Sequence, residues 1–324
     1  MPKITSMNKV LTITLEEPKS PYNFDANMHK PSHFPSSDNI WERGFYWISM
    51  LWQNQILGLK IENIGAVSKP KVMFHIYSKE KLSKKFIDGL TPELRWRFNF
   101  DQDISEFCSK YKEGKVLGPA IKKWKGMKPI AANSLYETLI IYIVLQNATV
   151  RRSVQMLENL FNTYGNKIKF DGKTISTFWS PEDIVKSSEE KLRELKVGYR
   201  AKMIMRLSQQ FVNKEIDEFK LRKIPKESIK EQMLRLYGIG PASLQYLLFE
   251  DFYILDDLVT IPPWETKIMS RLLFNKDFVP VKDIMKFFDK FKGYEKLAFH
   301  YIWENVFWKR KYEHIPWLEK EIRL

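Results

Sequence analysis

The sequence predicts a mainly helical protein with a β-rich N-terminal domain, that is, an α+β chain. The segments "GFYWISMLWQNQILGLKIENIG" and "KPKVMFHIYSKE" are short aromatic and β-branched runs broken by Gly and Pro, which is typical of antiparallel strands. From "DISEFCSKYKEG" to the C-terminus, apolar residues recur at helical spacing. The chain has 324 residues, enough for about two domains, because single cores rarely grow past about 250 to 300 residues.

The charge balance favours a polyanionic partner. The formal net charge is +14 and the isoelectric point is about 9.5. Such a surface attracts nucleic acid first and an acidic membrane second, and the alternative is a set of lysines that only face solvent.

The cysteine count and the hydropathy of the sequence indicate the cellular compartment of the protein. Cys108 is the single cysteine, which excludes an internal disulfide and a four-cysteine zinc or iron–sulfur site. The first twenty residues contain no long apolar run, and no later run approaches the length of a membrane span. We therefore expect an intracellular protein, located in the cytoplasm or nucleoid of a prokaryote or in the nucleus of a eukaryote.

The helical part has marked starts and ends. Ser134 followed by Glu137 forms a capping box before "LYETLIIYIVLQN", and Ser180 precedes Pro181 as an N-cap with proline in the first turn. Three further signals are a capping box at Ser187 with Glu190 and C-cap glycines at Gly165 and Gly198.

The segment "ESIKEQMLRLYGIGPASLQYLLFE" predicts two amphipathic helices joined by a glycine turn. Gly238 and Gly240 allow a turn whose backbone N–H groups lie beside a helix N-terminus, which suits a phosphate oxygen. Ile239 is expected to anchor the hairpin in the core. The alternative is an ordinary turn between two helices.

Five segments stand out in order along the chain: "VLQNAT" (144–149), "LKVGYRAKMI" (195–204), "LYGIGPASLQY" (236–246), "WETKIMSRLL" (264–273) and "LAFHYIW" (297–303). Together they resemble the helix-hairpin-helix (HhH-GPD) DNA N-glycosylase superfamily, and most of all its 3-methyladenine glycosylase II and 8-oxoguanine glycosylase branches. The resemblance covers most of the chain. It implies two helical lobes beside an antiparallel β module. We expect residues 1–98 to form the β-rich domain, residues 133–260 the lobe with the hairpin, and residues 99–132 with 261–324 the second lobe.

Departures from the family pattern select the chemistry. Bifunctional members carry a lysine two residues after the second hairpin glycine, where its amine attacks the sugar and forms a Schiff base. Ala242 occupies that place here, between Pro241 and Ser243. The resemblance therefore implies an enzyme without AP lyase activity.

The family's catalytic aspartate aligns with Glu265, and Asp257 in "ILDDLV" is the runner-up. The additional methylene of a glutamate moves its carboxylate by over about 1 Å, a displacement that can cost about a hundredfold in rate. Pro262 and Pro263 fix the approach to the helix and allow a compensating backbone shift. The alternative for Glu265 is an acidic residue that only stabilises the first turn of a helix.

The resemblance also implies a base pocket and DNA contacts. Tyr246 and Trp303 match aromatic pocket positions of the 3-methyladenine branch, and Trp264 is a third candidate; core packing is the alternative for the first two. The amide that fills the hole left by a flipped base is Gln146 or Asn147, unless it only caps its own helix. Further expected DNA contacts are Gly238, Ile239, Gly240, Arg200 and Lys202.

The resemblance thus implies a monofunctional DNA N-glycosylase of base excision repair that flips and excises damaged, alkylated purines from double-stranded DNA. The alternatives are a glycosylase for oxidised or deaminated bases and a non-catalytic DNA-binding protein with the same hairpin. We expect a monomer with no membrane partner, no metal and no cofactor, with a monovalent cation at the hairpin as an open alternative.

Overall fold

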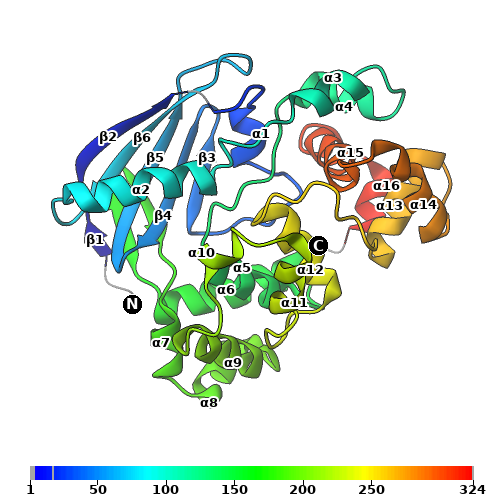
Figure 1. The fold of residues 1–324 in the computed structure, drawn as a ribbon. Coiled ribbons are helices and arrows are strands. Elements are labelled where there is room, and N and C mark those ends of the chain that lie inside the picture. The colour runs from blue at the N-terminus through cyan, green and yellow to red at the C-terminus, as the bar shows by residue number, and fades with distance from the viewer. Residues whose placement is uncertain (1–3, 17, 323–324) are drawn as a thin grey trace.

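The computed structural model describes residues 4–16 and 18–322, and its N-terminal part is a five-stranded antiparallel sheet (Figure 1). The strand order is β2-β6-β5-β4-β3, with bounds β2 (Asn8–Glu16), β3 (Asn39–Glu42), β4 (Phe45–Trp52), β5 (Gln55–Asn63) and β6 (Lys71–Ser78). Gln53 and Asn54, both at positive φ, join β4 to β5. This two-residue loop with two positive φ angles matches the right-handed twist of the flanking strands.

Two helices belong to this N-terminal part, α1 (Phe24–Met28) and α2 (Lys84–Arg97). The side chain of Ser83 caps α2 by accepting from the amide of Phe86. Leu90 and Leu94 of α2 lie in one buried cluster with side chains from the sheet such as Phe74. The sheet therefore buries one face under α2. The strand pattern in the sequence predicted the β-rich module but did not predict this helix.

A second, three-stranded sheet corrects the expectation that residues from about 103 onward are all helical. Its order is β1-β7-β8, with β1 (Ile4–Ser6) parallel to β7 (Lys167–Phe170), which is antiparallel to β8 (Lys173–Ser176). The segment "KIKFDGKTIS" alternates apolar and polar residues around Asp171 and Gly172, both at positive φ. This is the strongest short hairpin signal, and helical spacing on either side of it masked it.

The first helical lobe follows the sheet and has its own buried cluster. Its helices are α5 (Leu135–Leu145), α6 (Val150–Tyr164), α7 (Pro181–Val185), α8 (Glu189–Leu192), the π-helical η1 (Arg193–Val197), α9 (Arg200–Val212), α10 (Glu218–Leu221), α11 (Lys226–Met233) and α12 (Pro241–Glu250). The predicted capping box at Ser134 and the predicted N-cap at Ser180 are confirmed, and Ser180 also forms a capping box with Asp183.

The predicted capping box at Ser187 is wrong by one residue. Ser188 is the N-cap of α8 and accepts from the amide of Lys191. The Ser187 hydroxyl instead lies 2.8 Å from the Tyr164 hydroxyl. Local sequence favours Ser187 as the cap, but its hydroxyl is hydrogen-bonded to Tyr164, so Ser188 caps the helix.

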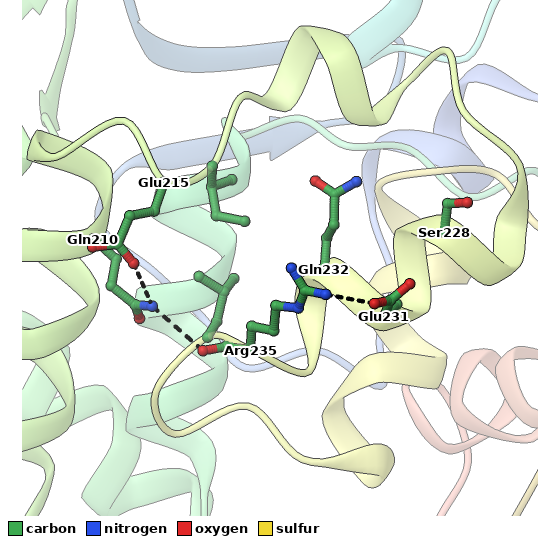
Figure 2. Close-up of a pocket in the computed structure, with 8 residues that line it drawn as sticks. Gln210, Glu215, Ser228, Glu231, Gln232 and Arg235 are labelled. Atoms are coloured by element: carbon green, nitrogen blue, oxygen red, sulfur yellow. Dashed lines mark hydrogen bonds and ion pairs between the residues drawn. The ribbon is translucent and has the colours of Figure 1, made fainter.

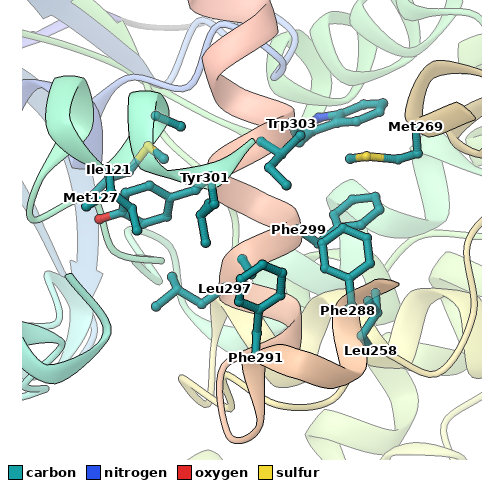
Figure 3. Close-up of a cluster of buried hydrophobic side chains, with 14 of the residues drawn as sticks. Ile121, Met127, Leu258, Met269, Phe288, Phe291, Leu297, Phe299, Tyr301 and Trp303 are labelled. Carbon is teal, nitrogen blue, oxygen red and sulfur yellow. The ribbon is translucent and has the colours of Figure 1, made fainter. Parts of the chain in front are cut away.

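The second lobe joins a mid-chain segment to the C-terminal third around one buried cluster. Its elements are α3 (Ser105–Tyr111), α4 (Leu117–Trp124), α13 (Pro263–Phe274), α14 (Val281–Phe288), η2 (Asp289–Phe291), α15 (Glu295–Arg310) and α16 (Pro316–Glu321). In Figure 1, α3 and α4 lie beside the C-terminal helices and far from their neighbours in sequence. Figure 3 shows α15 passing through this cluster, with Tyr301 facing Met127 on one side and Phe299 facing Phe288 on the other.

A buried ion-pair cluster connects α2 to α10. Glu93 of α2 accepts from Arg97 at 2.7 Å and from Arg222, the residue after α10, at 2.5 Å. Arg222 also pairs with Glu218.

In the described part of the chain, no helix has the length and apolar character needed to cross a membrane.

Candidate active site

The glycine hairpin lies between α11 and α12. Gly238 has φ +89°, a conformation that favours glycine, and an added Cβ would lie 3.2 Å from the Met203 side chain. Gly240 has φ −114°, and no heavy atom of the described residues lies within 4 Å of the position of an added Cβ. Ile239 is 7% exposed. Gly238 is therefore required by backbone conformation, whereas Gly240 leaves the N-terminus of α12 open to a ligand.

Glu265 lies in the first turn of α13, two residues after Pro263. Its side chain is 5% exposed, and the Tyr246 hydroxyl of α12 donates a 2.5 Å hydrogen bond to its Oε1. A helix of the hairpin lobe and a helix of the second lobe therefore meet at this carboxylate. Burial raises the pKa of Glu265, while the Lys296 ammonium and the bond from Tyr246 oppose the rise.

Lys296 of α15 is part of the same site, and sequence reasoning missed it. The residue is 2% exposed, and its Nζ lies 4.1 Å from the centroid of the Tyr246 ring and 5.0 Å from that of Phe299. Burial lowers the pKa of Lys296, and Glu265 is the largest opposing influence. The available signal was a lysine inside the apolar pattern "EKLAFHYIW".

A second carboxylate lies behind this pair. The Tyr142 hydroxyl donates to Glu250 Oε2 at 2.8 Å, and His33, from the loop after α1, lies 3.6 Å from Glu250 Oε1. Burial lowers the pKa of His33, but Glu250 outweighs it, so that the pKa lies above its usual value. The Tyr142 and Tyr246 rings stack at 6.4 Å. The N-terminal segment thus contributes a titratable group close to the site.

Asp257, the runner-up carboxylate, has structural partners. It is 5% exposed and lies 2.6 Å from the ammonium of Lys230 and 3.8 Å from that of Lys226. Its charge is therefore compensated within the hairpin lobe. No hydrogen bond joins it to Tyr246 or Glu265 among the described residues.

The aromatic candidates differ in exposure. Trp303 is 8% exposed within the cluster of the second lobe, and Trp264 is 38% exposed with its ring 5.1 Å from that of Trp303. The ring of Trp303 also stacks on Phe299 at 6.0 Å. In Figure 3, Trp303 points from α15 toward Met269 of α13. The two tryptophans thus form an edge-to-face pair beside Glu265, with Trp264 on the outside.

The expected filler residues have different surroundings. Gln146 ends α5, and its side-chain amide donates to the Gly238 carbonyl at 2.7 Å, so it supports the hairpin. Asn147 is exposed at φ +49°, and its Nδ2 lies 3.4 Å from the hydroxyl of Tyr199, which is 46% exposed. Asn147 is therefore the freer of the two amides, and Tyr199 is an exposed neighbour that sequence reasoning missed.

Arg200, one of the expected DNA contacts, has hydrogen-bond partners within the protein. It is 7% exposed, and its guanidinium donates to the carbonyls of Ile143 at 3.1 Å and of Gln146. Free carbonyls at the end of α5 attract this cation, and its role in the structure is to cap that helix. Lys202, two residues later on α9, is exposed.

A cavity of about 470 Å³ lies behind the hairpin rather than at Glu265 (Figure 2). Gln210 lines it, accepts from the Tyr237 amide at 2.9 Å and donates to Glu215 at 3.1 Å. Arg235 pairs with Glu231 on its other side. These groups pair with one another and support the hairpin.

Within the described residues, no group of three or more His, Cys, Asp or Glu is arranged to hold a metal ion.

Comparison with known proteins gives a consistent family. Residues 140–293 match the model of the HhH-GPD superfamily base excision DNA repair protein. The DNA-3-methyladenine glycosylase of Bacillus subtilis is 20% identical over 273 residues, which cover 79% of this chain and 88% of that protein. The N-glycosylase/DNA lyase of Saccharomyces cerevisiae is 30% identical over 200 residues, and the match spans 57% of this chain and 52% of the yeast protein.

Solved structures share the fold across nearly the whole chain. The structure of MBOgg1 in complex with a low affinity DNA ligand has a TM-score of 0.67 at 21% identity and covers 95% of this chain and 99% of that one. The 3-methyladenine DNA glycosylase of Archaeoglobus fulgidus has a TM-score of 0.68 at 15% identity, with coverages of 91% and 99%. Residues 140–293 thus match the HhH-GPD superfamily of base excision DNA repair proteins, and the chain shares its fold with solved DNA glycosylase structures.

Proposed function

We propose that this protein is a DNA N-glycosylase that hydrolyses the bond between a damaged purine and its deoxyribose in duplex DNA, with Glu265 as the catalytic carboxylate. The observation that carries the proposal is the position of Glu265: buried, at the start of α13, bonded to Tyr246 from the hairpin lobe. The open N-terminus of α12 supports a phosphate contact that would hold the duplex beside it.

The carboxylate acts on the charge that develops at the sugar. As the base leaves C1′, the sugar becomes oxocarbenium-like, and a nearby carboxylate stabilises the positive charge and orients a water. At a separation of about 4 Å and an effective dielectric constant of about 20, this attraction amounts to about 4 kcal/mol, or about a thousandfold in rate. Burial of Glu265 reduces solvent screening and supports such an effect.

Hydrolysis without strand cleavage is the second part of the proposal. Ala242, in the first turn of α12, replaces the hairpin lysine that would form a Schiff base. We expect the product to be an intact abasic strand. Treatment with borohydride during the reaction tests this, because a covalent enzyme–DNA band on a denaturing gel would require an acting amine elsewhere.

An alkylated purine is the first candidate substrate class. The Tyr246, Trp264 and Trp303 rings support it because electron-rich faces hold a flipped base. The B. subtilis relative, which is named a DNA-3-methyladenine glycosylase, supports it as well. An uncharged oxidised or deaminated purine is the second candidate, and the buried ammonium of Lys296 favours it.

An excision screen tests the function. Single-turnover reactions would use duplexes that carry 3-methyladenine, 7-methylguanine, hypoxanthine, uracil or 8-oxoguanine. Release of at least one base by the parent and its loss in Glu265→Gln support the proposal. If the parent binds every duplex and releases no base, the protein is a DNA-binding protein with the glycosylase fold.

A further inference from the structure

Among the described residues, the buried lysines Lys30, Lys128 and Lys296 have different surroundings. Lys30 and Lys128 are 8% and 0% exposed, and each ammonium donates to main-chain carbonyls, at 3.0 Å to Asn27 from Lys30 and at 3.0 Å to Lys19 from Lys128. Lys296 is 2% exposed, yet among residues 4–16 and 18–322 no oxygen accepts a hydrogen bond from its Nζ and no carboxylate lies within 4 Å of it. Only Lys296 of the three is left without an acceptor.

This arrangement is costly for folding alone. The ammonium of a residue that is only 2% exposed loses most of its hydration, and two ring faces replace only part of it. Such uncompensated groups persist where a ligand supplies the missing partner. The missing acceptor is therefore expected on the molecule that enters this site.

The position of the ammonium identifies that molecule. Its Nζ lies 4.1 Å from the centroid of the Tyr246 ring, and the hydroxyl of the same tyrosine is bonded to Glu265. Phe299, the second ring below Nζ, stacks on Trp303. The ammonium thus belongs to the group of rings that the proposed function assigns to the flipped base.

We propose that Lys296 donates a hydrogen bond and then a proton to an uncharged damaged purine, so that the site selects uncharged purines over cationic ones. This inference rests on the proposed glycosylase function and selects the second of its two candidate substrate classes. A cationic alkylated purine has no need of a proton to leave, and the ammonium repels it.

The reaction balances as follows. The C1′–N9 bond breaks and its electron pair stays on N9, while a proton of the Lys296 ammonium moves to a ring nitrogen or carbonyl oxygen of the departing base. Water adds its oxygen to C1′ and gives a proton to Glu265, which passes it to solvent. Lys296 then takes a proton from solvent, so the net change is the addition of one water.

The test compares Lys296→Met with the parent in single-turnover excision. Methionine keeps the length and apolar stem of the lysine and removes its charge and donors. We expect hypoxanthine and 8-oxoguanine excision to fall by about a hundredfold or more, because proton donation contributes about 10²–10⁴-fold. Excision of cationic 7-methylguanine should fall by much less or rise. Lys292→Met, an exposed lysine four residues earlier, is the matched control and should keep both parent rates.

The pH profile gives a second readout. Burial lowers the pKa of Lys296, against the opposing effect of Glu265, Glu250 and Asp257, and His300 also faces it. Excision of an uncharged purine should therefore decline on the alkaline side below the usual lysine range, and Lys296→Met should lack this limb.

Each outcome decides the inference. It is overturned if the parent releases 7-methylguanine and no uncharged purine, or if Lys296→Met slows both classes of base equally; the glycosylase function stands in either case. If the parent releases no base at all, the proposed function fails and the inference falls with it.

Discussion

The catalytic role that we propose for Glu265 is open to direct measurement. Glu265→Gln keeps the size of the side chain and removes its charge, so we expect single-turnover excision to fall by about a hundredfold or more with nearly unchanged affinity for damaged duplex. Glu265→Asp tests the reach of the side chain. A loss of rate would mean that the turn at Pro262 and Pro263 is adapted to the longer carboxylate. Parent-like excision by Glu265→Gln would remove Glu265 from the chemistry.

The excision rate should also fall at acid pH, where Glu265 becomes protonated. Burial raises the pKa of this carboxyl, and only the ionised form stabilises positive charge at the sugar. The rate should therefore decline, as pH falls, at a higher pH than for an ordinary glutamate of pKa about 4.3. Single-turnover rates across a pH series measure the midpoint, and a midpoint at the ordinary value would contradict the effect of burial.

Asp257 should matter for stability and little for chemistry. Asp257→Asn leaves the ammonium groups of Lys230 and Lys226 without a carboxylate, and both lysines are partly exposed. We expect a loss of about 1–2 kcal/mol in the free energy of unfolding, measured by urea denaturation, with excision retained. A fully stable but inactive variant would move the catalytic role to Asp257.

The residues found from sequence and those missed differ in physical kind. Glu265 and Tyr246 lie in segments whose order along the chain carries information, so local alignment finds them. Lys296 and His33 reach the site from α15 and from the loop after α1. Only tertiary packing brings Lys296 beside Tyr246 and His33 beside Glu250, and no local pattern encodes that placement.

At the scale of elements, the two hairpin glycines have different roles: Gly238 is needed for its backbone conformation, whereas Gly240 leaves space for a ligand. Gly240→Ala places a methyl group where the described residues leave open space, at a φ of −114° that alanine adopts freely. We expect an unchanged melting temperature and weaker binding of all duplex sequences alike, because a phosphate contact carries no sequence information. Equal affinity of the variant and the parent across a salt titration would remove the hairpin from the DNA interface. Gly238 gives no such clean test, because its positive φ strains any other residue.

Elements with strong local signals were predictable, such as α5 with its capping box at Ser134. The β7–β8 hairpin was missed although "DG" marks its turn, because four-residue strands inside a helical region give little periodicity. Ser187 was misassigned because its hydroxyl is bonded to Tyr164 rather than to a helix end. Local propensity fails where a tertiary contact offers a better partner.

At the scale of the whole molecule, Glu93 connects the sheet module to the hairpin lobe. Glu93→Gln leaves the buried Arg97 guanidinium without its carboxylate and leaves Arg222 with Glu218 alone, and we expect a loss of about 3 kcal/mol in the free energy of unfolding. Burial favours a raised pKa for Glu93, but the two arginines lower it. The stabilisation is therefore complete above the usual glutamate pKa and is lost as pH falls through the lowered value. Urea denaturation at neutral and acid pH measures both effects, with the exposed Glu80→Gln as control; equal stability of the two variants would contradict the coupling.

The parallel pairing of β1 with β7 sets an order for folding during synthesis. Ile4 pairs with Lys167 and Ser6 with Lys169, so β1 has no partner strand until α5, α6 and β7 have been translated. The antiparallel sheet from β2 to β6 needs only residues before 79 and forms from closer contacts. During synthesis, β1 therefore stays unpaired while the sheet from β2 to β6 folds. The β1–β7 pairing forms later, once β7 has been translated.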